Sequence, residues 1–239
     1  MTFTVKLADK IIQVEHIHSE LRTFCQDYLV ENCPPEFSIH LTQSDIDFEH
    51  NHTTEQTFSS AYLETLALLR KISDIFPNHQ RFLIHGASIS YEDKAYLFTA
   101  PSGTGKSTHI RLWKKFLGDK VKIVNGDKPF VSMETDPLIY GSPWAGKERW
   151  NRNCSEPLKA ICFIERGTSN AIKQMQPEEC LTMLFKQVYI PENEIAAAQT
   201  LELIDLLLRA VPIYLLTCDI SEEAVRCSFE ALTGIHYPN

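Results

Sequence analysis

The sequence lacks the features that mark several protein classes. Its most apolar stretch, residues 195–211, is interrupted by Glu202, Asp205 and Arg209, so no membrane-spanning helix is predicted. The first ten residues contain no apolar segment typical of a signal peptide. The 7 cysteines are odd in number and include no Cys-x-x-Cys pair, which disfavours a disulfide framework and a cysteine metal cluster. Together these absences predict a cytoplasmic protein without a membrane partner.

The sequence also has fewer basic than acidic residues. The chain has 23 Lys and Arg against 31 Asp and Glu, a net charge of -8, which argues against nonspecific binding of nucleic acid. Residues 81–170 are the exception, because basic residues outnumber acidic ones there while both flanking thirds are acidic. A bound anionic ligand would account for this local excess, and so would a solvated basic surface.

The chain does contain enough apolar material for a folded core, since 44% of its 239 residues are hydrophobic and 23% are charged. Alternation over residues 3–15 predicts a β-hairpin, and residues 37–41 predict a further strand. A helix ending before Pro77 is predicted to pack one apolar stripe, made of Phe58, Tyr62, Leu66, Leu69, Ile72 and Phe76. We assign residues 1–80 to an N-terminal segment of strands and a helix that packs on a core formed by residues 81–239.

Strand and helix patterns alternate from residue 81 onward. Strand-like runs cover residues 82–90 and 95–100, and a Gly-rich turn then leads into a predicted helix over 106–117 and a strand over 121–124. Two more strands are predicted over 159–164 and 213–217, and three more helices over 177–187, 195–209 and 221–232. Strand, Gly-rich turn, helix and strand in this order are typical of an α/β fold.

The clearest motif is residues 100–108, APSGTGKST, which match the phosphate-binding loop pattern with alanine at its first, glycine-preferring position. Glycine at two positions lets backbone N–H groups face a phosphate at the start of the following helix. Lys106 supplies a cation for the β- and γ-phosphates, and Ser107 offers a hydroxyl to Mg²⁺. The predicted cofactors are therefore ATP, with GTP left open, and Mg²⁺, and the predicted nucleotide contacts are Ser102, Gly103, Thr104, Gly105, Lys106, Ser107 and Thr108.

A carboxylate follows the next predicted strand. Asp127 ends the segment KIVNGD and is the sole acidic residue between Asp119 and Glu134. A carboxylate after an apolar strand and a glycine can reach the Mg²⁺ ion or the hydroxyl of a phosphate acceptor. The alternative is an aspartate that only caps a turn, since Asn-Gly-Asp is favourable turn chemistry.

Two further segments attract attention. His85 lies in an apolar run, where a lone histidine is commonly an interior residue. Residues 140–153 combine glycine, proline and two tryptophans with Lys147, Arg149 and Arg152, and such a density of charges and rings in a loop indicates contact with a ligand. A surface loop held by its aromatic residues is the alternative.

The residues Ile84-His85-Gly86-Ala87, the loop 102–108 and Gly126-Asp127 resemble the HPr kinase/phosphorylase branch of P-loop kinases, whose fold is related to that of phosphoenolpyruvate carboxykinase. The resemblance covers about residues 81–166 and does not extend to residues 1–80. It implies that His85 lies beside the reacting phosphates, that Lys106 and Ser107 hold nucleotide and metal, and that Asp127 is the general base. Catalysis is thus expected from Asp127, His85 and Lys106.

The chain departs from that family at one position. The family has two adjacent aspartates where this chain has Gly126 and Asp127, which places a reverse phosphorylase reaction in doubt. Rough alignment offers Glu148 as a further metal-facing carboxylate beside Ser107 and Asp127. The expected substrate or phosphate contacts are Lys147, Arg149, Arg152 and Arg166.

Shorter relatives of this family phosphorylate serine in small peptides, and this chain is similar to them in length. The predicted function is therefore a kinase that transfers the γ-phosphate of ATP to a hydroxyl, in particular a serine of a peptide or protein. Three alternatives stay open: a nucleotide sensor or peptide-binding regulator without turnover, a small-molecule kinase and a carboxykinase-like lyase. A sensor would need the phosphate-binding loop but no base.

Overall fold

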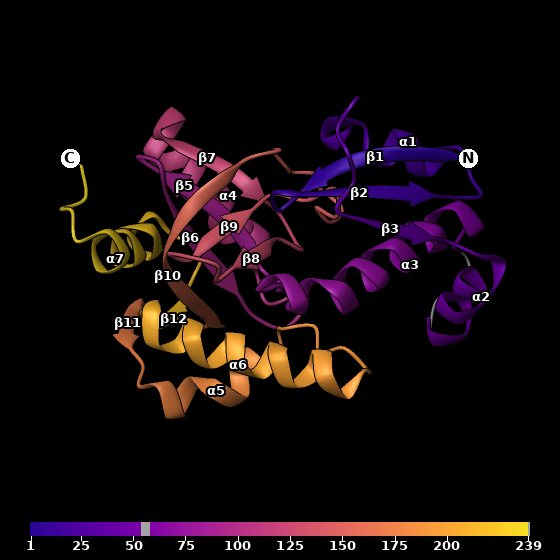
Figure 1. Ribbon diagram of the computed structural model, residues 1–239. Coiled ribbons are helices and arrows are strands. Elements are labelled where there is room, and N and C mark those ends of the chain that lie inside the picture. The colour runs from indigo at the N-terminus through magenta and orange to yellow at the C-terminus, as the bar shows by residue number, and fades with distance from the viewer. Residues whose placement is uncertain (54–57, 239) are drawn as a thin grey trace.

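The N-terminal residues form the predicted hairpin. The computed structural model describes residues 1–53 and 58–238 (Figure 1). Strand β1 (Thr2–Leu7) pairs antiparallel with β2 (Lys10–Glu15), and the turn residues Ala8 and Asp9 both have positive φ. Strand β3 (Phe37–His40) joins parallel to β2, which gives a three-stranded sheet within the described residues.

Helix α3 (Ser60–Ile75) is the predicted amphipathic helix, and the predicted stripe is confirmed in part, since Leu69, Ile72 and Phe76 are buried. Phe58 precedes the helix, and Tyr62 is 43% exposed. The buried face also includes Leu68 and the polar residue Glu64. Glu64 can be buried because its carboxylate accepts backbone N–H groups of the N-terminal segment at 2.6 and 2.9 Å. A search for apolar residues alone could not include it.

Two shorter helices, α1 (Glu20–Phe24) and α2 (Gln43–His52), accompany α3, with short 3₁₀ turns at Gln26–Tyr28 and Phe76–His79. The buried side chains of this N-terminal part form one apolar cluster that also includes residues from beyond position 80, namely Leu83, Phe130, Tyr140 and Trp144. Residues 1–80 and the rest of the chain thus contribute to one apolar cluster. The predicted boundary at residue 80 stays a prediction.

In the described residues a second, mixed sheet has nine strands, with the order β4-β8-β9-β10-β6-β5-β7, with β12 paired to β10 and with β11 paired to β12. Its strands are β4 (Arg81–Leu83), β5 (Ala87–Tyr91), β6 (Lys94–Thr99), β7 (Val121–Asn125), β8 (Phe130–Ser132), β9 (Leu138–Tyr140), β10 (Ser155–Arg166), β11 (Ala171–Gln174) and β12 (Ile213–Cys218). The long strand β10 pairs in parallel with β6 and β12 and antiparallel with β9. The chain is thus a mixed α/β protein.

Helices cover both faces of this sheet (Figure 1). Alternate side chains of β6 point to opposite faces, so Tyr96 and Phe98 pack with α4 (Lys106–Leu117) and α7 (Glu222–Thr233), while Leu97 packs on the side of α5 and α6. Helices α5 (Pro177–Phe185) and α6 (Glu194–Ala210) lie together below the sheet in Figure 1. Another 3₁₀ turn, Gly118–Lys120, follows α4.

The strand predicted over residues 82–90 is divided. β4 ends at Leu83 and β5 begins at Ala87, so His85 lies between strands and not within one. The remaining predicted elements after residue 90 are confirmed within a few residues, but the short strands β8, β9 and β11 were not predicted. No helix in the described parts of the chain is long and apolar enough to cross a membrane.

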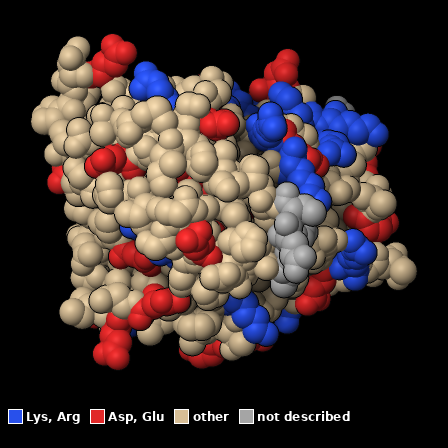
Figure 2. Space-filling view, turned by 90° about the vertical axis from the view of Figure 1, so that its right-hand side faces the viewer, with Lys and Arg blue, Asp and Glu red and all other residues tan. Residues whose placement is uncertain are grey.

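Charge is unevenly spread over the surface. Figure 2 views the molecule from the side on which β1–β3 and α2 lie, and Lys and Arg gather along one margin of that face. Asp and Glu are scattered over the rest, which is largely uncharged.

Candidate functional site

A short loop, residues 100–105, joins the end of β6 to the start of α4, and we call it the glycine loop. Gly103 and Gly105 have φ of 78° and 131°, values that residues with a side chain rarely adopt. A Cβ atom at either position would meet no atom within 4 Å, so both glycines face open space. Their backbone leads directly into α4, whose first N–H groups carry the positive end of the helix dipole.

Lys106 is folded back onto this loop. Its side chain is largely buried, and Nζ donates to the carbonyl oxygens of Ala100 at 2.9 Å and Pro101 at 3.4 Å. Burial lowers the pKa of Lys106, and the negative charge of Asp127 opposes that shift. Lys106 and Asp127 are therefore close enough to interact electrostatically.

Asn125 caps the turn that presents Asp127. The Oδ1 atom of Asn125 accepts the backbone N–H groups of Asp127 and Lys128, both at 2.8 Å. Asn125 is fully buried, and its amide Nδ2 donates to the backbone oxygen of Ser142 at 2.9 Å. Because Asn125 does the capping, the side chain of Asp127 is left for other contacts.

Asp127 pairs with His85. Nε2 of His85 lies 3.3 Å from Oδ1 of Asp127, while Nδ1 lies 3.0 Å from Oε1 of Gln187. Burial would raise the pKa of Asp127, but the hydrogen bond from His85 and the charge of Lys128, with a contribution from Lys106, outweigh it and lower the pKa. The carboxylate of Asp127 is therefore ionised at neutral pH.

The loop formed by residues 141–154 covers this turn. A Cβ atom on Gly126 would lie 2.7 Å from the backbone oxygen of Ala145, so the position admits no side chain without movement. A Cβ atom on Gly146 would lie 3.1 Å from Cβ of Asp127. A side chain at position 126 would therefore displace the backbone of the covering loop.

The 141–154 loop is itself held by the N-terminal part of the chain. The indole N–H of Trp144 donates to the backbone oxygen of Thr65 at 2.9 Å, and its ring packs edge-on against Phe24 at 5.7 Å. The amide of Asn153 donates to the backbone oxygen of Asp27 at 2.8 Å. Residues 1–80 therefore help to position the loop that covers Asp127.

The other predicted site residues are placed as follows. Ser107 is half-buried on the first turn of α4, whereas Ser102 and Thr108 are exposed. Glu148 lies 3.2 Å from the guanidinium of Arg111. Lys147, Arg149 and Arg152 are exposed on the covering loop. In residues 1–53 and 58–238 no three His, Cys, Asp or Glu side chains converge as a metal cluster.

Arg166, at the end of β10, contacts the glycine loop. Its Nε donates to the backbone oxygen of Thr104 at 2.9 Å, and Nη2 donates to that of Gly103. A hollow of about 490 Å³ opens here, between the loop, the end of β10 and Met183 of α5. Arg166, which was predicted to contact phosphate, therefore lies at the glycine loop and donates to its backbone carbonyl groups.

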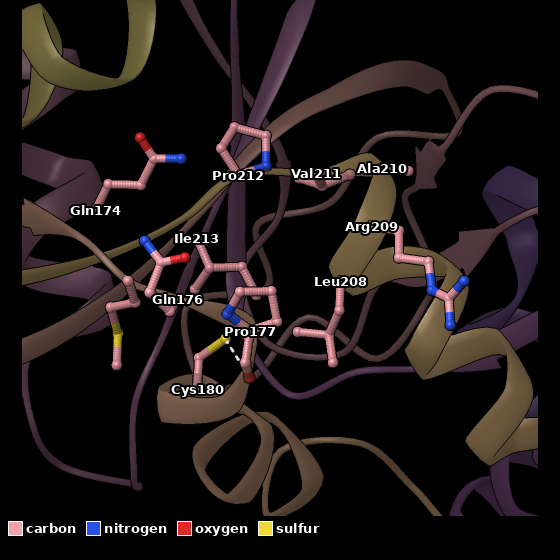
Figure 3. Close-up of a pocket in the computed structure, with 11 residues that line it drawn as sticks. Gln174, Gln176, Pro177, Cys180, Leu208, Arg209, Ala210, Val211, Pro212 and Ile213 are labelled. Carbon is pink, nitrogen blue, oxygen red and sulfur yellow. Dashed lines mark hydrogen bonds between the residues drawn. The ribbon is translucent and has the colours of Figure 1, made fainter.

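A smaller hollow of about 270 Å³ lies at the other end of the parallel strands, where β12 begins (Figure 3). Its lining includes Gln174, Gln176, Cys180 and residues 208–213, and Cys180 donates its thiol to the backbone oxygen of Pro177 at 3.3 Å. None of the predicted site residues lines this second hollow.

Four residues of the site were missed from the sequence: Asn125, Lys128, Ser142 and Gln187. Asn125 had a local signal, because both Asn and Asp in the segment Asn-Gly-Asp can cap a turn. The sequence interpretation assigned that role to the aspartate alone. Gln187 had no local signal, because it is 102 residues from His85 in the sequence and only the fold brings the two side chains together.

These features define a mixed α/β protein in which a glycine loop and a His–Asp pair lie at the same end of strands β5, β6 and β7. The chain belongs to the family described as SynChlorMet cassette protein ScmC, whose model matches residues 49–225. Among solved structures it is similar to the HPr(Ser) kinase/phosphatase from Coxiella burnetii, with a TM-score of 0.36 and 11% identity, over 64% of this chain and 93% of that chain. So distant a likeness carries no functional conclusion. No curated protein matches the chain.

Proposed function

We propose that this protein is an ATP-dependent kinase that transfers the γ-phosphate to a hydroxyl group, and that the hydroxyl belongs to a serine of a peptide or protein. The observation that supports this most is the carboxylate of Asp127, which lies 3.3 Å from Nε2 of His85 and whose pKa is lowered in part by the charge of Lys106. A loop that only senses nucleotide needs no such carboxylate beside its lysine.

The glycine loop suits a triphosphate. Both of its positive-φ glycines face open space, and a phosphate placed there would meet backbone N–H groups at the start of α4. Lys106 has donors that can turn from the carbonyls of its own loop to phosphate oxygens.

A magnesium ion fits the same place. Ser107 offers an oxygen ligand of the kind that Mg²⁺ prefers, and phosphate oxygens and water would complete its coordination, which leaves Asp127 to act as the base. The ion, when bound, would neutralise charge on the phosphates. Glu148, which we expected to help, is engaged with Arg111.

In the proposed reaction Asp127 accepts the proton of the acceptor hydroxyl. The hydroxyl oxygen forms a bond to the γ-phosphorus, the bond between that phosphorus and the β–γ bridging oxygen breaks, and ADP leaves. A carboxylate with a lowered pKa is a weak base, so the proton moves late, when the acceptor oxygen has begun to bond to phosphorus. His85 keeps one oxygen of Asp127 occupied and so orients the other.

The test is the substitution Asp127→Asn, which keeps the size of the side chain. Transfer from γ-labelled ATP to a library of serine-containing peptides and small alcohols should fall about a hundredfold or more. Affinity for MgATP should change only a few-fold, and the exposed Arg209→Ala variant should match the wild type in both.

The outcomes separate the alternatives. Equal loss of binding and transfer would make Asp127 a metal ligand and not a base. Steady MgATP binding with no phosphorylated product from any acceptor would favour a nucleotide sensor. A product formed only from a free amino acid or alcohol would identify a small-molecule kinase.

A further inference from the structure

Arg166 reaches the glycine loop from a distant part of the chain. It is the last residue of β10, and its guanidinium contacts backbone oxygens more than 60 residues away in sequence, at Thr104 and Gly103. A guanidinium presents its N–H groups as a planar fork, so it can hold two adjacent carbonyls at once. A lysine ammonium has no such fixed geometry.

The carbonyl groups of the loop are nearly all engaged. Lys106 donates to the carbonyl oxygens of Ala100 and Pro101, and Arg166 donates to the carbonyl oxygens of Gly103 and Thr104. The backbone N–H of His109 donates to that of Gly105, at 2.9 Å. Two cations therefore hold the two halves of the loop.

Holding a carbonyl also orients a donor. Within a planar trans peptide the C=O and the following N–H point in opposite directions. By fixing the oxygen of Thr104 on one side, Arg166 turns the N–H of Gly105 to the other side, and Gly105 is one of the two residues that face open space.

We infer that Arg166 is a positioning residue that keeps the glycine loop in its binding conformation before any nucleotide arrives. This role differs from the direct phosphate contact predicted from the sequence. The nucleotide part of the inference rests on the proposed function, but the effect on the empty loop does not. When Lys106 turns toward a phosphate, Arg166 still holds the other half of the loop.

The first test uses the nucleotide-free protein and hydrogen–deuterium exchange of the backbone N–H groups of Thr104 and His109, which donate to the backbone oxygens of Pro101 and Gly105. Arg166→Ala removes both hydrogen bonds, each charge-assisted, and exchange should speed up about tenfold or more. Arg166→Lys keeps the charge without the fork and should show most of this effect. The matched control is Arg209→Ala, an exposed arginine at the far end of α6, which should leave exchange of the loop unchanged.

The second test is calorimetric titration with MgADP, which lacks the γ-phosphate, alongside MgATP. A positioning role predicts that Arg166→Ala weakens both nucleotides by the same factor, about tenfold, with little further loss in the rate of transfer. Unchanged exchange of the empty loop, or loss of MgATP affinity with MgADP affinity retained, would overturn the inference and make Arg166 a γ-phosphate contact. If the wild type binds neither nucleotide, the proposed function fails while the exchange result still decides the role of Arg166.

Discussion

The buried imidazole of His109 should make the stability of this protein depend on pH. His109 lies in α4, one turn after Lys106, and is 3% exposed. Its Nε2 lies 3.0 Å from Oγ of Ser228 and 3.2 Å from the indole nitrogen of Trp113, while its buried Nδ1 has no partner. Burial lowers the pKa of His109 from 6.5 to about 4.

The sign follows from proton binding. Below pH 6.5 the unfolded chain protonates this histidine, whereas the folded protein does so only near pH 4. Between these values the unfolded state holds more protons, so the free energy of unfolding falls as the pH is lowered. At 1.36 kcal/mol per pKa unit, the loss from this one group is about 3 kcal/mol across that window.

Urea unfolding at pH 7, 6, 5 and 4.5 measures the effect, with His109→Gln as the perturbed variant. The glutamine can still accept from Trp113 but does not titrate, so the difference in stability between wild type and variant should shrink by up to about 3 kcal/mol toward low pH. The exposed His50→Gln variant is the control for other titrating groups and should run parallel to the wild type. Parallel curves for all three proteins would refute the reasoning.

Three further predictions concern the turn that carries Asp127. Gly126→Ala should lower the free energy of unfolding by about 2 kcal/mol in urea titrations, because its Cβ would lie 2.7 Å from a backbone oxygen; an unchanged midpoint would contradict the covering loop. Asn125→Ala leaves two backbone N–H groups without an acceptor and should cost about 2 kcal/mol by the same titration, with transfer reduced alongside. Trp144→Phe keeps an aromatic ring but loses the hydrogen bond to Thr65, so thermal unfolding should show a loss of about 1 kcal/mol; no loss would mean that the indole N–H contributes nothing.

The elements that the sequence predicted well are those with a local signal. Alternation over residues 3–15 predicted β1 and β2, and the APSGTGKST segment predicted the loop and the start of α4 at Lys106. Such patterns depend only on residues a few positions apart.

What escaped prediction depends on distant partners. The buried face of α3 was predicted only in part, because Glu64 also belongs to it and is buried by hydrogen bonds from the backbone of residues 17 and 18. His85 could be called an interior residue or a participant until the fold placed it beside Asp127 and Gln187. The contact of Arg166 with phosphates stays a prediction, and its hydrogen bonds to the backbone of Gly103 and Thr104, more than 60 residues away, had no local signal.

The most direct test of the central claim is a crystal structure with magnesium and a non-hydrolysable ATP analogue. The account predicts the phosphates against the backbone of residues 103–106, with the terminal phosphate facing the carboxylate of Asp127. An analogue bound elsewhere, or a terminal phosphate that points away from Asp127, would contradict it.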